Sequence, residues 1–242
     1  LFQQIANSGK VVLMAASNVY TNENGSELIL PTQEGRELRI DEQGPECKPT
    51  PEIPEGSKVD AGITYEQAYE LLKKYNKDDF HLRHGRTVGG LMRYFAKKYD
   101  PENEEFWGIV GMLHDLDWEE WQVPVTHTVK TAELLEEEGV NLQVAHAVQT
   151  HNCEYNASLP VPVHKMEKML WACDELSGLI GATVAMYPSH SSEDLNLKSL
   201  KKKFKNKAFA AGCDREDIEK GAALNGNTLD ELFSDMIEAY QS

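Results

Sequence analysis

Closely spaced cysteines, a surplus of basic residues and long apolar runs are all missing from this chain of 242 residues. No stretch approaches the roughly 18 apolar residues that a membrane span needs. The opening residues 1–5 have no basic region followed by an apolar core, so they do not resemble a secretory signal. The cysteines form no CxxC pair, which excludes a zinc ribbon and suits free thiols in a reducing compartment. We therefore expect a cytoplasmic protein with no membrane segment. The four cysteines are Cys47, Cys153, Cys173 and Cys213.

The charge balance is strongly acidic, with 40 acidic against 24 basic residues and a formal net charge of −16. Nonspecific binding to duplex DNA needs cations that neutralise phosphates, so this composition argues against a DNA partner. Anionic substrates are repelled as well, unless a metal or a local basic patch reverses the field. The length allows one large domain, or a medium domain with an appendage, and a sizeable core.

The first 62 residues differ from the rest in composition and in the pattern of their apolar residues. Short strand-like runs at 10–14, 27–30 and 36–40 are separated by turn-forming residues, which predicts a small β meander over residues 1–43. Such a sheet is marginal alone and must pack on something. Residues 44–62 carry four prolines and three glycines, a composition that disfavours helix and sheet. They form either a linker or an arm that wraps the main domain.

A helical pattern occupies residues 63–242. Thr64 and Gln67 match a capping box at the start of the first helix. Gly139 and the Asp100-Pro101 step end later helices. The fold class is therefore mainly α, with a small N-terminal β-rich appendage. The expected helices cover about 64–75, 80–99, 104–114, 126–138, 141–151, 164–186 and 228–241.

Several residues of metal-binding type fall on or beside these helices. His84 continues into the apolar stripe of its helix, and a histidine on such a face needs a buried partner. His114 and Asp115 follow a strongly apolar run, so they emerge at the inner end of a buried helix. Burying a carboxylate without a charge partner costs several kcal/mol, which a cation would offset. The alternative without a metal is an ordinary helix C-terminus at which Asp115 is solvated.

Asp174 is also unusually placed, in the middle of a long apolar helix. Aspartate has a poor helix propensity, and the small Ser177 and Gly178 leave space beside it. A carboxylate that reaches a metal explains this position, whereas Glu175 next to it has the position of an ordinary surface carboxylate.

An early His, a Leu-His-Asp after an apolar run, and a later helix carrying Ala172-Cys-Asp174-Glu-Leu-Ser-Gly178 together resemble the HD superfamily of metal-dependent phosphohydrolases. The resemblance covers about residues 64–240 and implies an HD-type helical bundle. It assigns the metal ligands of the family to His84, His114, Asp115 and Asp174. In many members two further histidines bind a second metal, and His127 and His151 stand in the corresponding interval, although His127 also fits a surface position.

In the two-metal arrangement Asp115 bridges the ions, and a water activated between them attacks phosphorus. Fe, Mn, Co, Ni, Mg and Zn are all candidate metals. Asp117 is a candidate for proton transfer or for support of the metal ligands, as are Glu119 and Glu120, although each also suits a solvent-facing position. Arg83, Arg86 and Lys202, the last in a lysine-rich run, are candidate phosphate contacts, with a solvated charge run as the alternative.

The leading expectation is a metal-dependent phosphohydrolase that acts on a nucleotide or another phosphate ester. Within enzymes the alternative is a di-iron HD-type oxygenase that cleaves a C–C or C–P bond, because the same ligand set holds iron. From another class, the chain is a non-catalytic nucleotide sensor or interaction module. The substrate, the number of metals and the formation of a homo-oligomer are open at this level.

Overall fold

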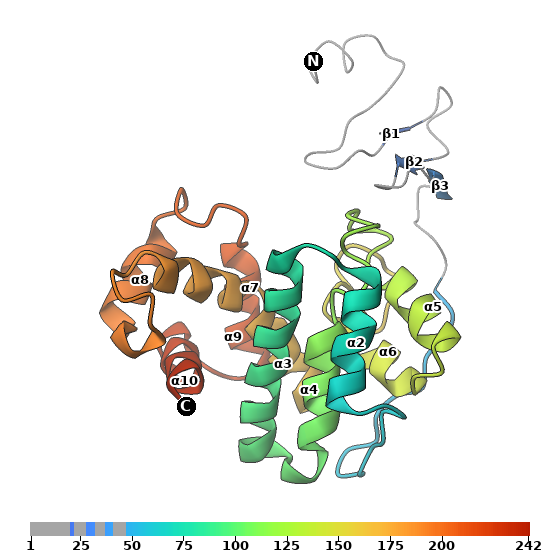
Figure 1. The fold of residues 1–242 in the computed structure, drawn as a ribbon, viewed down its shortest axis with the longest axis horizontal. Helices are drawn as coiled ribbons and strands as arrows, with labels where there is room; N and C mark the ends of the chain where they lie inside the picture. Colours follow the sequence, from blue (N-terminus) through green and yellow to red (C-terminus); the bar gives the residue numbers. More distant parts are fainter. Residues whose placement is uncertain (1–19, 22–27, 32–36, 41–46) are drawn as a thin grey trace.

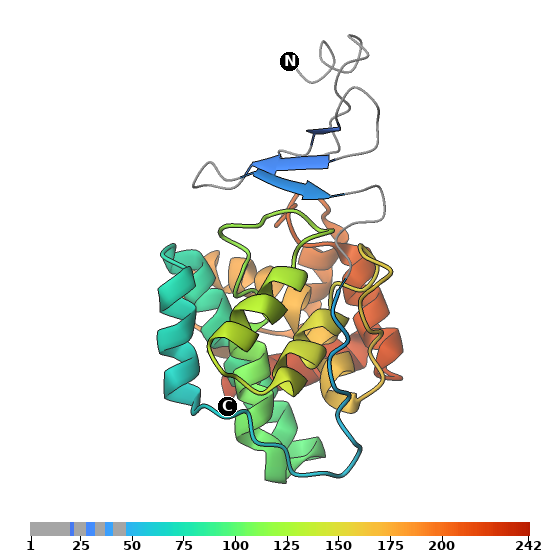
Figure 2. The same cartoon turned by 90° about the vertical axis from the view of Figure 1, so that its right-hand side faces the viewer.

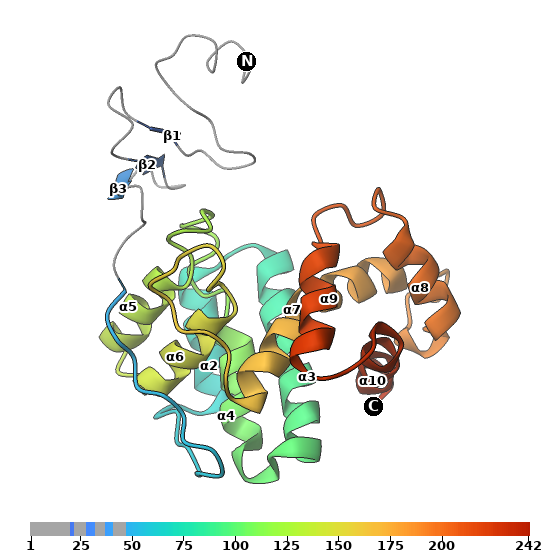
Figure 3. The same cartoon turned by 180° about the vertical axis from the view of Figure 1, so that it is seen from behind.

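Helix α4 (Glu104–Leu113) lies at the centre of the helical body, and all its residues from 106 to 113 are buried. Helices α2, α3 and α6 pack directly on it, and α7 packs on α3, α6 and α9. The computed structural model describes residues 20–21, 28–31, 37–40 and 47–242. Figures 1 and 3 show α8 and α10 on one side of this body and α5 and α6 on the other. The helices are α2 (Tyr65–Tyr75), α3 (Asp79–Tyr99), α4 (Glu104–Leu113), α5 (Val129–Glu137), α6 (Leu142–Thr150), α7 (Lys165–Ala185), α8 (Leu197–Lys205), α9 (Arg215–Leu224) and α10 (Leu229–Gln241), with 3-10 turns η1 (Pro101–Asn103) and η2 (Ser192–Asp194).

The mainly helical fold confirms the sequence analysis, and helices α2 to α7 and α10 confirm the expected ranges to within a few residues. The capping box at α2 is present, since Thr64 Oγ1 accepts from Gln67 N at 3.2 Å and Gln67 Oε1 accepts from Thr64 N at 2.8 Å. Helices α8 and α9 were not predicted. Asn196 and Asp214 cap their N-termini through side-chain oxygens.

Three short strands precede the helical body. They are β1 (Tyr20–Thr21), β2 (Leu28–Pro31) and β3 (Glu37–Ile40), paired antiparallel in the order β1-β2-β3. Two of them overlap the expected strand-like runs, whereas the run at 10–14 lies outside the described residues. An independent β appendage over residues 1–43 stays a prediction.

Residues 47–62 run along the outside of the helices before the chain enters α2 (Figure 2). Thr50 Oγ1 lies 3.0 Å from both His146 Nδ1 and Gln149 Oε1 on α6. Farther along, Val59 N donates to Asn103 Oδ1 at 2.8 Å, and Asn141 N donates to Ala61 O at 2.9 Å. The segment is therefore held by hydrogen bonds to α6, including its N-cap Asn141, and to Asn103 at the start of α4.

Candidate metal centre

The C-terminal end of α4 carries the first two ligand-type residues. The buried helix stops at Leu113, and His114 is its C-cap with a fully buried side chain. Asp115 follows in the turn and projects from the same point. A helix C-terminus bears a partial negative charge, and His151 likewise caps the end of α6. Two helix ends therefore favour a cation at this place.

The first ligand group joins α3, α4 and α7. His84 Nε2 lies 3.0 Å from His114 Nε2 and 3.1 Å from Asp174 Oδ1. Asp115 Oδ2 lies 3.5 Å from His84 Nε2 and 3.4 Å from His114 Nε2. One donor atom from each of these four residues falls within 4.8 Å of the others. The chain thus brings together the four residues predicted as the primary metal ligands.

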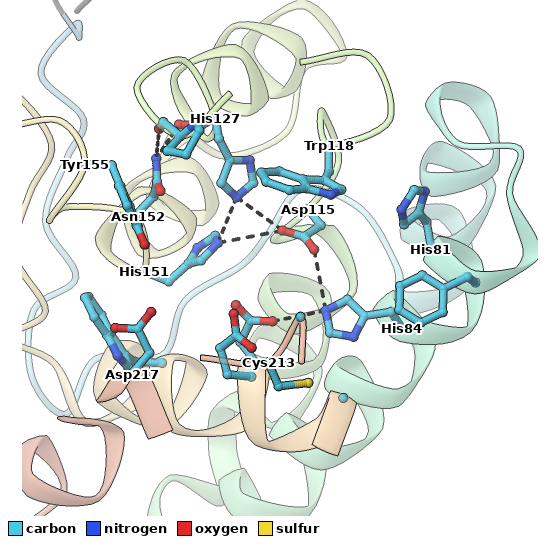
Figure 4. A pocket seen from close by; sticks show the side chains of 17 residues that line it. His81, His84, Asp115, Trp118, His127, His151, Asn152, Tyr155, Cys213 and Asp217 are labelled. Atoms are coloured by element: carbon cyan, nitrogen blue, oxygen red, sulfur yellow. Dashed lines mark hydrogen bonds and ion pairs between the residues drawn. The ribbon is translucent and has the colours of Figure 1, made fainter. Parts of the chain in front are cut away.

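The second ligand group lies on the other side of Asp115. His127 Nε2 is 3.2 Å from Asp115 Oδ1 and 3.1 Å from His151 Nε2, and His151 Nε2 is 3.8 Å from the same oxygen. Figure 4 shows the Asp115 carboxylate between His84 and His127. Each of its oxygens therefore faces a different pair of imidazoles, which is the geometry of a bridging carboxylate.

Hydrogen bonds determine which ring nitrogen of each histidine carries the proton. Nδ1 of His114 lies 2.8 Å from Gly111 O, and Nδ1 of His151 lies 2.5 Å from Val148 O. A carbonyl only accepts, so both Nδ1 atoms donate and both Nε2 atoms carry a free lone pair when the rings are neutral.

The other two histidines are fixed in the same way. His127 Nδ1 donates to the Asp117 carboxylate at 2.7 Å. His84 Nδ1 lies 3.4 Å from Ser177 Oγ, and this hydroxyl gives its own proton to Asp174 O at 2.8 Å, so it accepts from the ring. Four Nε2 lone pairs and two carboxylates consequently converge, and they need positive charge among them.

In the metal-free protein, the pKa values of the ligand-type residues also indicate a site that favours positive charge. Burial acts to lower the pKa of His127, but Asp117 and Asp115 outweigh it and raise this pKa to about 10. Burial also opposes ionisation of Asp174, yet His114 and His84 hold its pKa well below the usual range. The carboxylates thus favour a positive charge at the imidazoles, and in the absence of a metal a bound proton supplies it.

Asp117 supports His127 from behind. Its side chain is buried, and besides His127 it accepts from Thr128 N at 2.9 Å and Thr131 N at 3.1 Å through Oδ2. Thr128 has a φ of 65°, a strained conformation for a β-branched residue. Asp117 is not among the residues that line the pocket, and its bond to His127 fits the first of its two expected roles, support of a ligand-type histidine, whereas proton transfer stays a prediction.

A pocket of about 420 Å³ opens on both ligand groups. The sequence analysis missed most of its wall, which includes Phe80, Trp118, Tyr155 and Trp171. It also misjudged Glu175, which is half-buried and lines this pocket instead of facing bulk solvent. Burial, followed by the charge of Asp174, raises the pKa of Glu175 to about 8. Apolar periodicity gives no signal for an aromatic side chain that borders a cavity rather than the core.

The predicted phosphate contacts lie elsewhere. Arg83 and Arg86 are exposed on α3, where the Arg86 guanidinium stacks over the Tyr69 ring at 5.2 Å. Lys202 is exposed on α8. None of the three is among the described residues that line the pocket, and their phosphate role stays a prediction. All three lie on the exposed faces of their helices, because each helix turns its apolar face to the core.

Glu119 also has a structural partner instead of a pocket position. Its carboxylate accepts from Lys77 N at 2.8 Å and Asp78 N at 2.6 Å and lies 2.9 Å from His81 Nδ1. These bonds connect the α4–α5 segment to the start of α3.

The donor set fits some metals better than others. Four imidazole nitrogens with two carboxylates suit Fe, Mn, Co, Ni or Zn, whereas Mg²⁺ prefers oxygen ligands and retained waters. Of the predicted candidates, Mg is therefore the poorest match. The fit rests on the tautomers described above, which present every Nε2 lone pair to the centre.

Comparisons with known proteins add no assignment. No protein-family model, no curated protein and no solved structure matches the chain. Among the described residues, none of the helices has the length and apolar character required to cross a bilayer.

Proposed function

We propose that this protein is an HD-type metal-dependent phosphohydrolase with a two-metal site. The observation that carries the proposal is the position of Asp115, whose two oxygens each face a separate pair of imidazoles. The order of the ligand residues along the chain, with His-Asp at the end of a buried helix and Asp174 in a later helix, supports the same family.

Bound divalent ions would supply Lewis-acid stabilisation of a phosphoryl group and lower the pKa of a water. The chain's own residues hold these ions and shape the reaction space. Asp115 joins the two positions, and Asp117, Ser177 and the carbonyls of Gly111 and Val148 keep the rings oriented. Hydrolysis of a phosphate ester at this site would release phosphate and an alcohol.

A direct test measures bound metal and phosphate release in the wild type and in His114→Ala. We expect close to two ions per chain in the wild type after loading with Fe, Mn, Co, Ni or Zn, and phosphate release from a panel of nucleotides and simple esters. His114→Ala should lose metal and activity by roughly 100-fold or more. His190→Asn is the control, because His190 is exposed and asparagine tolerates its positive φ of 51°.

His114 is fully buried, so circular dichroism must show that the variant folds. His84→Gln, at a half-buried position, provides a second disruption of the same ligand group. Equal and near-zero metal in the wild type and both variants would refute the proposal.

The di-iron oxygenase remains a second candidate, because the imidazole-rich donor set suits iron as well as any other ion. Oxygen consumption by the iron-loaded protein on phosphonates or polyols, with no phosphate release, would favour it. Tight nucleotide binding without turnover under every metal would favour a sensor instead.

A further inference from the structure

One part of the pocket is both acidic and aromatic. We call it the acidic end and define it by Tyr155, Trp171, Glu175 and Asp217, all of which line the pocket. Trp171 and Glu175 are one turn apart on the pocket side of α7, Asp217 belongs to α9, and Tyr155 follows α6. Figure 4 shows Tyr155 and Asp217 together, on the side of the pocket away from His84 and His81.

Little positive charge balances these carboxylates. Glu175 accepts one backbone hydrogen bond, from Asp214 N at 3.0 Å, and among the described residues no Lys or Arg pairs with it. Asp217 lies 3.3 Å from Lys220 Nζ, but this ammonium is shared with Glu154. No Lys or Arg lines any part of the pocket among residues 47–242. The acidic end therefore presents carboxyl oxygens to the cavity, and no Lys or Arg among the described lining residues neutralises them there.

The Tyr155 side chain lines the pocket together with these carboxylates. Burial, and then the charges of Asp217, Asp214 and Glu175, raise the pKa of its hydroxyl, whereas Lys220 acts to lower it. Tyr155 is nevertheless 51% exposed, so one side of it is free for a ligand. Aromatic faces and carboxylates together attract organic cations, most strongly where water is excluded.

We propose that the substrate is a phosphate ester whose alcohol part carries an organic cation, a quaternary or protonated amine, which binds at the acidic end. This inference rests on the proposed phosphohydrolase activity, in which the metal ligands hold the phosphoryl group. A substrate with further phosphates at its other end is disfavoured, because they would meet Glu175 and Asp217 without a compensating cation. The non-reacting end of the substrate thereby determines specificity through charge.

The test compares two esters that differ in one charge. Phosphocholine and 3,3-dimethylbutyl phosphate have nearly the same shape, and only the first bears a cation. For the metal-loaded wild type we expect kcat/KM to favour phosphocholine by roughly five- to thirty-fold. The preference should fall to about one in Glu175→Gln and should decrease in Tyr155→Leu. Glu219→Gln is the matched control, since Glu219 is exposed on α9 and does not line the pocket.

Calorimetric titration of choline and of 3,3-dimethylbutan-1-ol, the two alcohols without their phosphate, gives a readout that needs neither metal nor turnover. Tighter binding of choline than of the uncharged alcohol, lost in Glu175→Gln, supports the inference even where neither ester is the true substrate. Equal hydrolysis of the two esters and equal binding of the two alcohols overturn it while leaving the phosphohydrolase proposal intact. Faster hydrolysis of glycerol phosphate or AMP than of phosphocholine also overturns it. Absence of bound metal and of phosphate release from every ester instead contradicts the proposed function.

Discussion

Replacing Asp117 by asparagine should remove one metal position without removing a metal ligand. The Asp117 carboxylate accepts from His127 through Oδ1 and from the backbone of Thr128 and Thr131 through Oδ2. An asparagine has only one side-chain oxygen, so its NH₂ group must replace one of the two carboxylate oxygens. If the NH₂ group faced the two backbone N–H groups, donors would oppose donors. If it faces His127, the imidazole can change its tautomer and accept.

The asparagine oxygen should therefore stay with the backbone, and its NH₂ group should donate to His127 Nδ1. The proton then moves to His127 Nε2, the atom that lies 3.2 Å from Asp115 Oδ1, and the lone pair that would bind metal is lost. Changes of this kind behind a metal-binding histidine cost roughly 10–100-fold in affinity. The change from carboxylate to amide in a buried network should cost about 1–3 kcal/mol of unfolding free energy.

Metal content after dialysis against a range of free-metal concentrations measures the effect, and elemental analysis gives ions per chain. We expect two ions for the wild type and one for Asp117→Asn at concentrations that saturate the wild type. Asp100→Asn is the control, because Asp100 also accepts side-chain hydrogen bonds, from Asn103 and Trp107, but lies far from both ligand groups in the fold. Undiminished metal content and affinity in Asp117→Asn would refute the tautomer argument.

Two further predictions concern packing and pH. A Cβ added at Gly221 would lie 2.7 Å from Ala172 Cα, so Gly221→Ala should destabilise the α7–α9 contact by about 1–3 kcal/mol in urea unfolding. Gly181→Ala meets no atom within 4 Å and should be neutral or stabilising by up to about 1 kcal/mol, and equal costs at both positions would contradict the packing described. In chelator-treated protein, the fold raises the pKa of Glu175 from 4.5 to about 8, so the folded state favours the protonated carboxyl. The contribution of protonated Glu175 to the free energy of unfolding is fully present below pH 4.5 and is lost as the pH rises through 8. The melting temperature of Glu175→Gln should vary less than that of the wild type between these values, and identical pH profiles would count against the pKa shift.

The sequence predicted the ligand residues better than the pocket around them. His114 and Asp174 could be found because a polar residue beside an apolar helical stripe contradicts the local pattern, and the structure brings both into one group. The conformation at Thr128 and the choice between the two roles offered for Asp117 could not, because they depend on a turn whose hydrogen bonds link the end of one helix to the start of another.

The predicted phosphate contacts lie outside the pocket lining for a related reason. Arg83 was selected for its proximity to His84 in the sequence, but neighbouring positions on a helix point in different directions. Helices α8 and α9 were missed although the sequence carries signals for them, since Leu197, Leu200 and Phe204 recur at helical spacing and Asn196 and Asp214 occupy the caps. Aromatic side chains such as Tyr155 look the same in a sequence whether they line a cavity or the core.

The two ligand groups differ greatly in the length of chain that each must close. His84 and Asp174 are 90 positions apart, whereas His127 and His151 are separated by 24. Closing the shorter loop costs less conformational entropy, and local contacts form earlier during folding. The half of the site made by His127 and His151 can therefore assemble while α7 is still undocked, and the other half is complete only when the helical body has closed. A metal ion captured early by the local half would bias the nascent chain toward the native arrangement around Asp115.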